Sequence, residues 1–294
     1  MDEKAALTME FERNRGRLRA VAYRMLGSLS EADDAVQETW IRLGRTDAAT
    51  ILNLEAWLTT VVGRVCLNML RSRTTRREDP LDERLPDPVV SPVSGVEPEQ
   101  EALVADSVGL ALMVVLERLA PAERLAFVLH DMFSVPFEEI APAVDRTPAA
   151  TRQLASRARR RVQGATPRPD ADVARQRRVV DAFFAAAERG DFDALVGVLD
   201  PDVVLRSDQG PGEPMRLVRR AEAVAGQALM FAGPQRTVRP VLVNGAAGVV
   251  VEIAERPVAV MAFTVAGDRV VAIDALGDAA RLRDLDLATA LGGD

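Results

Sequence analysis

Helix-type and strand-type segments are segregated along this chain of 294 residues, and that order restricts the folds open to it. Residues 9–73 and 100–163 carry apolar side chains at helical spacing. Two further helices are expected at 173–189 and 192–199, and β-like runs come only after them. The predicted strands are 203–207, 215–219, 238–244, 248–254, 258–265 and 270–276, with a helix at about 221–231 and a short one after Asp278. Helices followed by a meander are typical of helical domains joined to a compact α+β domain.

Two stretches that contain prolines divide the helical segments from one another and from the strands. The first, at 76–99, predicts an extended linker and not a packed element, because closely spaced prolines oppose regular structure. The second lies at 165–172. We therefore expect a multidomain protein with two all-α domains, at 9–75 and 100–164, and an α+β domain at 173–294.

Residues that interrupt the first helical segment predict its helix boundaries. Gly27 predicts the end of one helix, because glycine readily adopts the left-handed conformation found after helix C-termini. Ser30 predicts the N-cap of the next helix, with Asp33 three residues later in place of a capping-box glutamate. A third helix is expected at 54–72.

The distribution of charge points to nucleic acid, although the net charge is −7. Two segments carry arginines and no acid. The first contains Arg64, Arg71, Arg73, Arg76 and Arg77, and the second contains Arg146, Arg152, Arg157, Arg159, Arg160 and Arg161. Because exposed charges are screened beyond about 8–10 Å, such local clusters matter more than the total. We therefore expect contact with nucleic acid at two places.

Several classes of protein are excluded by what the sequence lacks. Cys66 is the only cysteine, which excludes an intrachain disulfide and a cysteine-based zinc site, and we expect no cofactor and no metal. No run of about 18 apolar residues could span a membrane. The first residues, MDEKAALTMEFERNR, lack the apolar stretch of a signal peptide. We therefore expect a cytoplasmic protein without membrane contact.

A helix-turn-helix pattern lies at the end of the second helical segment. A short helix at 137–144 is followed by a break at Asp145 and Arg146 and by a longer helix at 147–162. The first turns of such a helix enter the major groove of DNA, where arginine can bind guanine and glutamine can bind adenine. The alternative is a basic, solvated helix of an ordinary bundle. The residues expected to contact DNA are Thr147, Ala149, Arg152, Gln153, Ser156, Arg157 and Arg160.

Two helices of the first segment carry opposite charges. The helix around Val36 has an acidic ridge with no basic residue between its acids, which suits a basic protein partner, although an ordinary solvated face gives the same pattern. The helix at 54–77 has a basic edge suited to the phosphates of a melted strand. The acidic ridge consists of Asp33, Asp34, Gln37 and Glu38. The basic edge consists of Arg64, Asn68, Arg71, Arg73, Arg76 and Arg77.

These segments together resemble a known family. ADDAVQETWIRL (32–43) and LEAWLTTVVGRVCLNMLRSR (54–73) resemble the sigma-2 domain of extracytoplasmic-function sigma factors of RNA polymerase, and residues 116–162 resemble the sigma-4 domain. The resemblance implies that the acidic ridge docks on the clamp helices of the largest subunit of core RNA polymerase. It implies that the loop before Trp57 and the basic helix read and open the −10 element of promoter DNA. The helix from Thr147 would read the −35 element.

The rest of the chain resembles members of that family with an added C-terminal domain. RLPDPVV (84–90) is similar to their linker motif, and residues 188–210 are similar to the opening of a SnoaL-like domain. The resemblance implies a cone-shaped α+β fold with a curved sheet, which modulates activity through intramolecular contact with the sigma core and the linker. The match is imperfect, since Arg84 stands where tryptophan is usual and the glycine-rich signature at 207–214 is interrupted.

The C-terminal segment offers few residues for catalysis. His130, the only histidine, lies in the helical half. Asp202, Asp208 and Asp274 are the acids available for proton transfer, and turns or polar contacts explain them as well. A small, unidentified ligand could be held in the cone, because such folds offer a pocket.

Three functions remain open on this sequence. The first is a sigma factor that catalyses nothing itself. The second is a one-component DNA-binding regulator whose C-terminal domain senses a small molecule. The third is a cyclase or isomerase fused to a DNA-binding module. The acidic ridge and the basic helix favour the first over the second, because a simple repressor needs only the helix-turn-helix. The shortage of catalytic residue types argues against the third.

Overall fold

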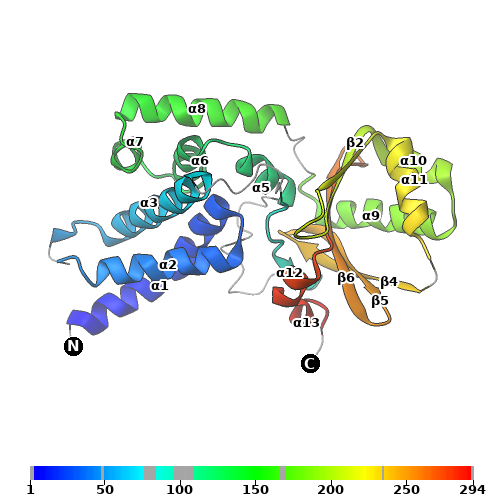
Figure 1. The fold of residues 1–294 in the computed structure, drawn as a ribbon, viewed down its shortest axis with the longest axis horizontal. Helices are drawn as coiled ribbons and strands as arrows, with labels where there is room; N and C mark the ends of the chain where they lie inside the picture. The colour runs from blue at the N-terminus through cyan, green and yellow to red at the C-terminus, as the bar shows by residue number, and fades with distance from the viewer. Residues whose placement is uncertain are drawn as a thin grey trace. The chain divides into compact units, whose positions relative to one another are not determined.

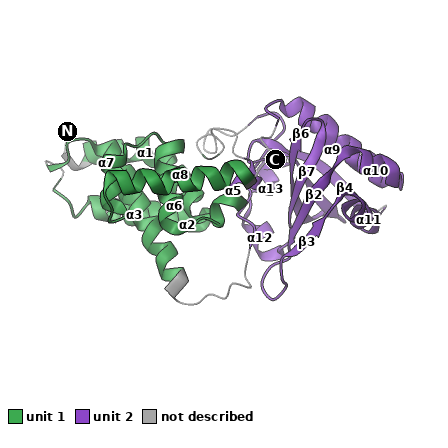
Figure 2. Ribbon diagram, turned by 90° about the horizontal axis from the view of Figure 1, so that it is seen from above, with its two compact units in different colours: residues 1–78, 99–106, 113–165 green, residues 79–98, 107–112, 166–294 purple. Residues whose placement is uncertain are grey.

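The computed structural model describes residues 3–47, 50–75, 84–95, 103, 109–165, 170–233 and 235–292. Its chain divides into two compact units, which Figure 2 shows in different colours. The first unit comprises residues 1–78, 99–106 and 113–165, and the second comprises 79–98, 107–112 and 166–294. Both predicted helical domains therefore belong to one unit. The predicted linker is grouped mainly with the C-terminal segment.

The first unit begins with three helices that pack against one another, α1 (Glu3–Leu26), α2 (Leu29–Leu43) and α3 (Leu54–Thr75) (Figure 1). Gly27 ends α1 as predicted, with φ +73°. The left-handed backbone conformation favours glycine at this position, and the Glu117 carboxylate lies against it. The apolar residues that recur at helical spacing in α1 are all buried: Leu18, Val21, Ala22, Met25 and Leu26.

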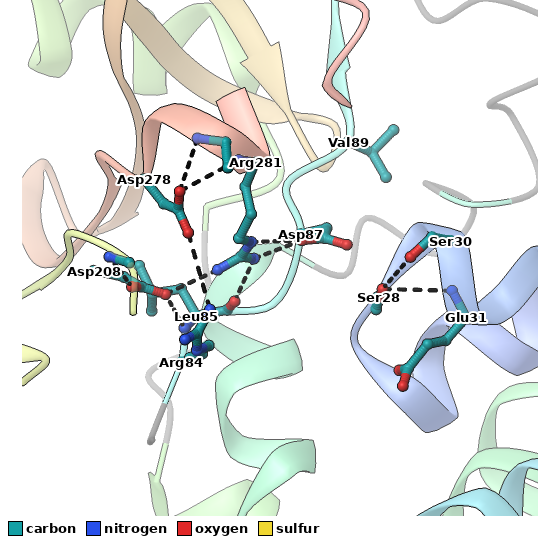
Figure 3. Close-up of polar contacts among 12 residues, drawn as sticks. Ser28, Ser30, Glu31, Arg84, Leu85, Asp87, Val89, Asp208, Asp278 and Arg281 are labelled. Carbon is teal, nitrogen blue, oxygen red and sulfur yellow. Dashed lines mark hydrogen bonds and ion pairs between the residues drawn. The ribbon is translucent and has the colours of Figure 1, made fainter. Parts of the chain in front are cut away.

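The N-cap of α2 is Ser28, so the prediction of Ser30 was wrong. The Glu31 N–H donates to the Ser28 hydroxyl (3.5 Å), and Ser30 lies inside the helix with its hydroxyl 3.1 Å from that of Ser28 (Figure 3). The capping-box position three residues after the cap is therefore held by Glu31 and not by Asp33. Two serines lie in the same short stretch, and the one that follows the helix-ending glycine directly is the cap.

The second half of the first unit is built from short helical elements. Leu125 and Leu129 pack on α3 at Gly63, where a Cβ atom would lie 2.9 Å and 3.1 Å from their methyl groups. Glycine at position 63 thus lets α3 approach the segment that contains Leu125 and Leu129 closely. The elements are α5 (Leu110–Glu117), α6 (Pro121–Phe127), the π-helical turn η3 (Val128–Met132), α7 (Phe137–Ile140), the 3₁₀ turn η4 (Ala141–Ala143) and α8 (Pro148–Ala165). The predicted apolar residues Leu116, Leu119, Leu125, Val128 and Leu129 are buried.

The second unit contains a seven-stranded sheet in the order β1-β4-β5-β6-β7-β2-β3. Neighbouring strands are antiparallel except β2 and β7, which are parallel. The strands are β1 (Val90–Ser91), β2 (Leu199–Asp208), β3 (Arg216–Arg219), β4 (Arg236–Val243), β5 (Ala246–Ile253), β6 (Arg256–Ala266) and β7 (Arg269–Leu276). All six predicted strands are present, and β1 is an addition that the sequence did not predict.

Helices cover the sheet of this unit. Figure 1 shows α9 (Val173–Glu188), α10 (Phe192–Val198) and α11 (Ala221–Phe231) over one face. Alternate residues of the strands point into an apolar core beneath them, because successive side chains of a strand face opposite sides. Phe183, Phe184 and Phe263 meet edge to face in this core. Two short helices, α12 (Ala279–Asp284) and α13 (Leu287–Ala290), follow the last strand.

Candidate nucleic-acid interface and linker anchor

A helix-turn-helix formed by α7, η4 and α8 presents one polar face to solvent. The turn contains Asp145 in the left-handed conformation (φ 55°), and the Arg146 N–H donates to the Ala141 carbonyl (3.1 Å). The Thr147 hydroxyl then accepts from the Ala150 N–H (3.2 Å) and caps α8. Ala141 is buried, as the close approach of two helices requires. The predicted helix, turn and second helix are therefore confirmed.

The orientation of α8 follows from its buried residues. Thr151, Ala155 and Ala158 are fully buried at helical spacing and fix which side faces the fold. The opposite side carries the residues that the sequence pattern selected for DNA contact. Thr147, Ala149, Arg152, Gln153, Arg157 and Arg160 are exposed, and Ser156 is half-buried. The structure brings these residues onto one surface that a major groove could accept.

Several arginines of α8 are held by carboxylates of the same unit. Glu123, which is 7% exposed, pairs with Arg157 at 3.1 Å and with Arg161 at 2.8 Å. Asp131 pairs with Arg159 at 2.5 Å. The sequence grouped all these arginines by density alone and gave no signal of the pairing, because their partners lie more than 25 residues away along the chain.

The basic edge of α3 is only partly accessible in this conformation. Arg64, Asn68 and Arg71 are exposed and lie on one edge of the helix, as predicted. The Arg64 guanidinium donates to the Pro142 carbonyl of the helix-turn-helix (3.0 Å), and Arg71 lies 4.0 Å from the Asp145 carboxylate. Arg73 forms an ion pair with Glu31. Two further residues of the predicted edge, Arg76 and Arg77, lie outside the described residues.

The loop before α3 exposes an apolar side chain that sequence reasoning missed. Leu52 is fully exposed, whereas most other leucines of this unit are buried. Asn53 beside it accepts a hydrogen bond from the Ala56 N–H (3.1 Å), which fixes the start of the helix. Trp57 is half-buried. In the sequence Leu52 looked like any other apolar residue near a helix start, and only its exposure marks it.

The acidic ridge of α2 is exposed but is not free of basic partners. Asp33, Asp34 and Gln37 are exposed, and Glu38 is partly buried. Asp33 pairs with Arg19 (2.8 Å), and Glu38 pairs with Arg42 one turn along the helix (2.8 Å). The expectation of a wholly unpaired ridge was therefore wrong, because the cations come from outside the interval that the sequence reasoning considered.

The predicted linker is in part a packed element, so the expectation that it is only extended was wrong. Leu85, Val89 and Val90 are buried. Strand β1 pairs with β4 at the edge of the sheet. The Asn244 N–H also donates to the Val89 carbonyl (2.7 Å), and the Val89 N–H donates to the Asn244 amide oxygen (3.1 Å). The strand is short, with prolines on either side, and so had no periodic signal.

Arg281 of α12 is the centre of a polar cluster that we call the linker anchor, formed by Arg84, Leu85, Asp87, Asp208, Asp278 and Arg281 (Figure 3). Its guanidinium donates to Asp87 (2.6 and 2.9 Å), to Asp208 (2.8 Å) and to the Leu85 carbonyl (2.6 Å). The Leu85 N–H donates to Asp208 (2.9 Å). One arginine thus joins the linker to the end of β2. Charge-assisted bonds of this kind are stronger than neutral ones.

Asp278 supports the same cluster from the N-terminus of α12. Its carboxylate accepts from the N–H groups of Ala280 and Arg281, and it lies 3.9 Å from Arg84. Gly210 (φ 96°) packs so closely that a Cβ there would lie 2.7 Å from the Asp278 carboxyl carbon. A glycine of the interrupted signature is thus required by both its conformation and its neighbour.

Two of the three acids considered for catalysis are held in ion pairs with arginines. Asp208 belongs to the linker anchor, and Asp274, 1% exposed, pairs with Arg206 at 2.5 Å. Asp202 is exposed within β2, where the register is irregular between Leu199 and Val204, and its own N–H donates to the Asp200 carboxylate (2.9 Å). His130 donates through Nδ1 to the Val135 carbonyl (3.0 Å) in the helical unit. Within the described ranges, no group of three or more His, Cys, Asp or Glu residues could hold a metal ion.

The buried ionisable groups of the first unit are structural. Cys66 is fully buried, and desolvation raises the pKa of its thiol to about 12, so the reactive thiolate is suppressed at neutral pH. Burial lowers the pKa of Arg124 to about 10, and its Nε donates to the Arg24 carbonyl (2.9 Å). Among the helices that the structure describes, none is long and apolar enough to cross a membrane.

Comparison with known proteins shows which family the chain resembles. Residues 11–76 match the family model for Sigma-70 region 2, and residues 109–162 match that for Sigma-70 region 4. The ECF RNA polymerase sigma factor SigJ of Mycobacterium tuberculosis is 44% identical over 219 residues, which cover 73% of this chain and 70% of that protein. A probable ECF sigma factor of the same species, SigI, is 37% identical over 212 residues, covering 72% of this chain and 73% of SigI.

The likeness to a solved structure extends over all three predicted domains. The crystal structure of Mycobacterium tuberculosis SigJ matches with a TM-score of 0.77 and 35% identity, and the match covers 95% of this chain and 99% of that one. The C-terminal domain has the SnoaL-like fold that the sequence predicted, with a mixed sheet and helices over one face.

Proposed function

The chain belongs to the extracytoplasmic-function sigma factors of RNA polymerase, and we propose how its surfaces divide the work of such a factor. As a sigma factor it binds core polymerase and directs transcription initiation at promoters. The specific roles of its residues and the control exerted by its C-terminal domain are our proposals. The cytoplasm, where polymerase and promoters are found, is its proposed location.

The −35 element is proposed to be read by α8. Support comes from the exposed surface that carries Arg152, Gln153 and Arg160 on the side opposite the buried Ala155. Arginine forks onto guanine and glutamine onto adenine, and each good pair of this kind contributes about 1–3 kcal/mol of discrimination. Arg160, on the same surface, is suited to a phosphate. Arg157 is a weaker candidate, because Glu123 already pairs with it.

The −10 element is proposed to be read by α3 and the loop before it. The basic edge formed by Arg64, Asn68 and Arg71 would follow the backbone of the melted strand. Leu52 and the half-buried Trp57 flank the start of this helix and offer apolar contact to an unstacked base. Arg64 and Arg71 contact the helix-turn-helix in this structure, so binding both promoter elements requires those contacts to exchange for DNA.

Core polymerase is proposed to bind the acidic ridge through the clamp helices of its largest subunit. Asp34 is the centre of that ridge, since Asp33 and Glu38 already have arginine partners on α1 and α2. Replacement Asp34→Lys is expected to weaken binding of the full chain to core polymerase, measured by fluorescence anisotropy. An unchanged affinity would remove Asp34 from the interface.

The C-terminal domain is proposed to act as a regulator and not as an enzyme. The observation that carries this is the linker anchor, in which Arg281 and Asp208 hold the segment that connects the two promoter-reading regions. A domain that fixes the linker restricts how far those regions can separate. Two of the acids considered for proton transfer, Asp208 and Asp274, are held by Arg281 and Arg206, which supports a structural role for them.

Transcription in vitro tests this proposal. Core polymerase, promoters from the region upstream of the gene and the full chain are combined, and Arg281→Ala is compared with Arg283→Ala. Arg283 lies on the same short helix but is exposed, and among the described residues its guanidinium donates to the carbonyl of Ala279 in that helix (3.1 Å), so it is a matched control. We expect initiation to depend on the protein and to change with Arg281→Ala alone.

Each result has a distinct meaning. Equal transcription with both variants would show that the anchor does not regulate. Specific binding of duplex DNA by the chain, without binding to core, would favour a one-component regulator.

A further inference from the structure

An aromatic stack lies behind the base-reading surface of α8. The Phe137 ring, at the start of α7, is stacked on the His130 imidazole with centroids 3.8 Å apart and an interplanar angle of 28°. The Arg152 guanidinium lies over the same Phe137 ring, 5.2 Å from its centroid. The ring is 8% exposed, whereas Arg152 is exposed. A buried group thus contacts a side chain that faces solvent.

The His130 ring, on which Phe137 is stacked, is held by a hydrogen bond of its own. His130 belongs to the π-helical turn η3, and its Nδ1–H donates to the Val135 carbonyl (3.0 Å), which sets the tautomer and the ring plane. Phe137 follows Pro136, whose fixed backbone starts α7. The ring on which Arg152 rests is therefore supported by the His130 imidazole on one side and by the start of α7.

An arginine needs such support to discriminate bases. Its side chain has several rotatable bonds, and the planar guanidinium must lie in the plane of a guanine to form two parallel hydrogen bonds. Stacking on an aromatic face restricts the plane while leaving the N–H groups available. Gln153, the next residue, is exposed and does not lie over an aromatic ring in the part of the chain that the structure describes.

We propose that Phe137, held by His130, is a positioning residue that sets the Arg152 guanidinium for base reading in the −35 element. The inference rests on the proposed role of α8. It goes further by assigning specificity to a residue that never touches DNA. It also gives the single histidine of the chain a role, which the sequence alone did not.

The test measures base preference and not only affinity. Holoenzyme made from core polymerase and the full chain is used to select from a promoter library in which the −35 region is randomised, and bound DNA is sequenced. Arg152→Ala is expected to flatten preference at one or two adjacent positions. Phe137→Leu keeps an apolar core but removes the π face, and it is expected to reduce preference at those same positions about 2- to 5-fold. Phe137→Tyr should restore it.

A control separates positioning from stability. Ile140 is fully buried on the same helix α7 and is not aromatic, so Ile140→Val should lower the unfolding midpoint without altering base preference. In the Arg152→Ala background, Phe137→Leu should have no further effect on preference.

Two outcomes would overturn the proposal for different reasons. If Arg152→Ala changes preference but Phe137→Leu does not, or if Phe137→Leu weakens all sequences equally, the positioning role is wrong while α8 remains the reader. If Arg152→Ala leaves every position unchanged, the base-reading role of Arg152 itself fails, and the positioning role fails with it.

Discussion

Arginine serves different ends in the two units of this sigma factor. On α8, Arg152 and Arg160 are exposed on the proposed DNA surface. In the C-terminal domain, the Arg206 and Arg281 side chains are only 13% and 18% exposed and lie against aspartates at 2.5 to 2.8 Å. The comparison teaches that arginine density does not by itself mark a nucleic-acid site. A carboxylate supplied by the fold competes with phosphate for an arginine, and Arg157, paired with Glu123, shows that α8 contains both kinds.

The largest effect is expected from the buried pair in the sheet of the C-terminal domain. Arg206→Ala removes the cation beside Asp274, which is 1% exposed, and should lower the free energy of unfolding by about 3–5 kcal/mol. Denaturant unfolding of the full chain measures this loss, taken from the transition of the C-terminal domain. Replacing both residues with apolar ones of similar size should cost much less. Equal losses for the single and double variants would contradict this account.

A smaller effect is expected at the linker anchor. Arg281→Ala should destabilise the C-terminal unit by about 2–3 kcal/mol, because it leaves the Asp208 and Asp87 carboxylates without their shared donor. Hydrogen exchange at the Val89 and Ser91 amides should accelerate in the same variant. Arg283→Ala should stay within about 0.5 kcal/mol of the wild type. Unchanged exchange would show that β1 holds the linker alone.

Paired and unpaired arginines of α8 should differ in their salt dependence. Arg160→Ala is expected to lower the slope of log K against log salt by about 1 for binding of promoter DNA by the holoenzyme, since it would remove one phosphate contact. Arg157→Ala should change the slope less, because Glu123 pairs with this arginine. Titrations at several salt concentrations give both slopes. Equal slopes would remove the distinction between the two arginines.

The smallest effect on stability at neutral pH is expected from the buried thiol of Cys66 in the helical unit. Since burial raises the pKa of Cys66 from 9.0 to about 12, folding favours the protonated thiol. The stability from this group is therefore complete below pH 9 and is lost as pH rises toward 12. Folded protein should resist alkylation by iodoacetamide at pH 8, followed by mass spectrometry, and unfolded protein should react. Rapid modification of the folded chain would contradict the burial.

The sequence was informative wherever the physics is local. Helical spacing in α1 and α8, the left-handed requirement at Gly27 and the alternation of β-branched residues in the strands each depend on residues within a few positions of one another. The Ser30 error is local as well, because Ser28 with Glu31 matches the capping box better than Ser30 with Asp33, and that match was passed over. The backbone of the structure confirms Ser28 as the cap.

By itself the sequence determined the order of helical and strand-forming segments, the helix-turn-helix and the face of α8 that turns outward. Tertiary structure decided which arginines are paired, that the linker joins the sheet as β1, and that Phe137 and His130 lie behind Arg152. The physical reason is distance along the chain. Arg281 and Asp87 are 194 residues apart, and no periodic pattern can signal a contact that exists only after the whole domain has folded.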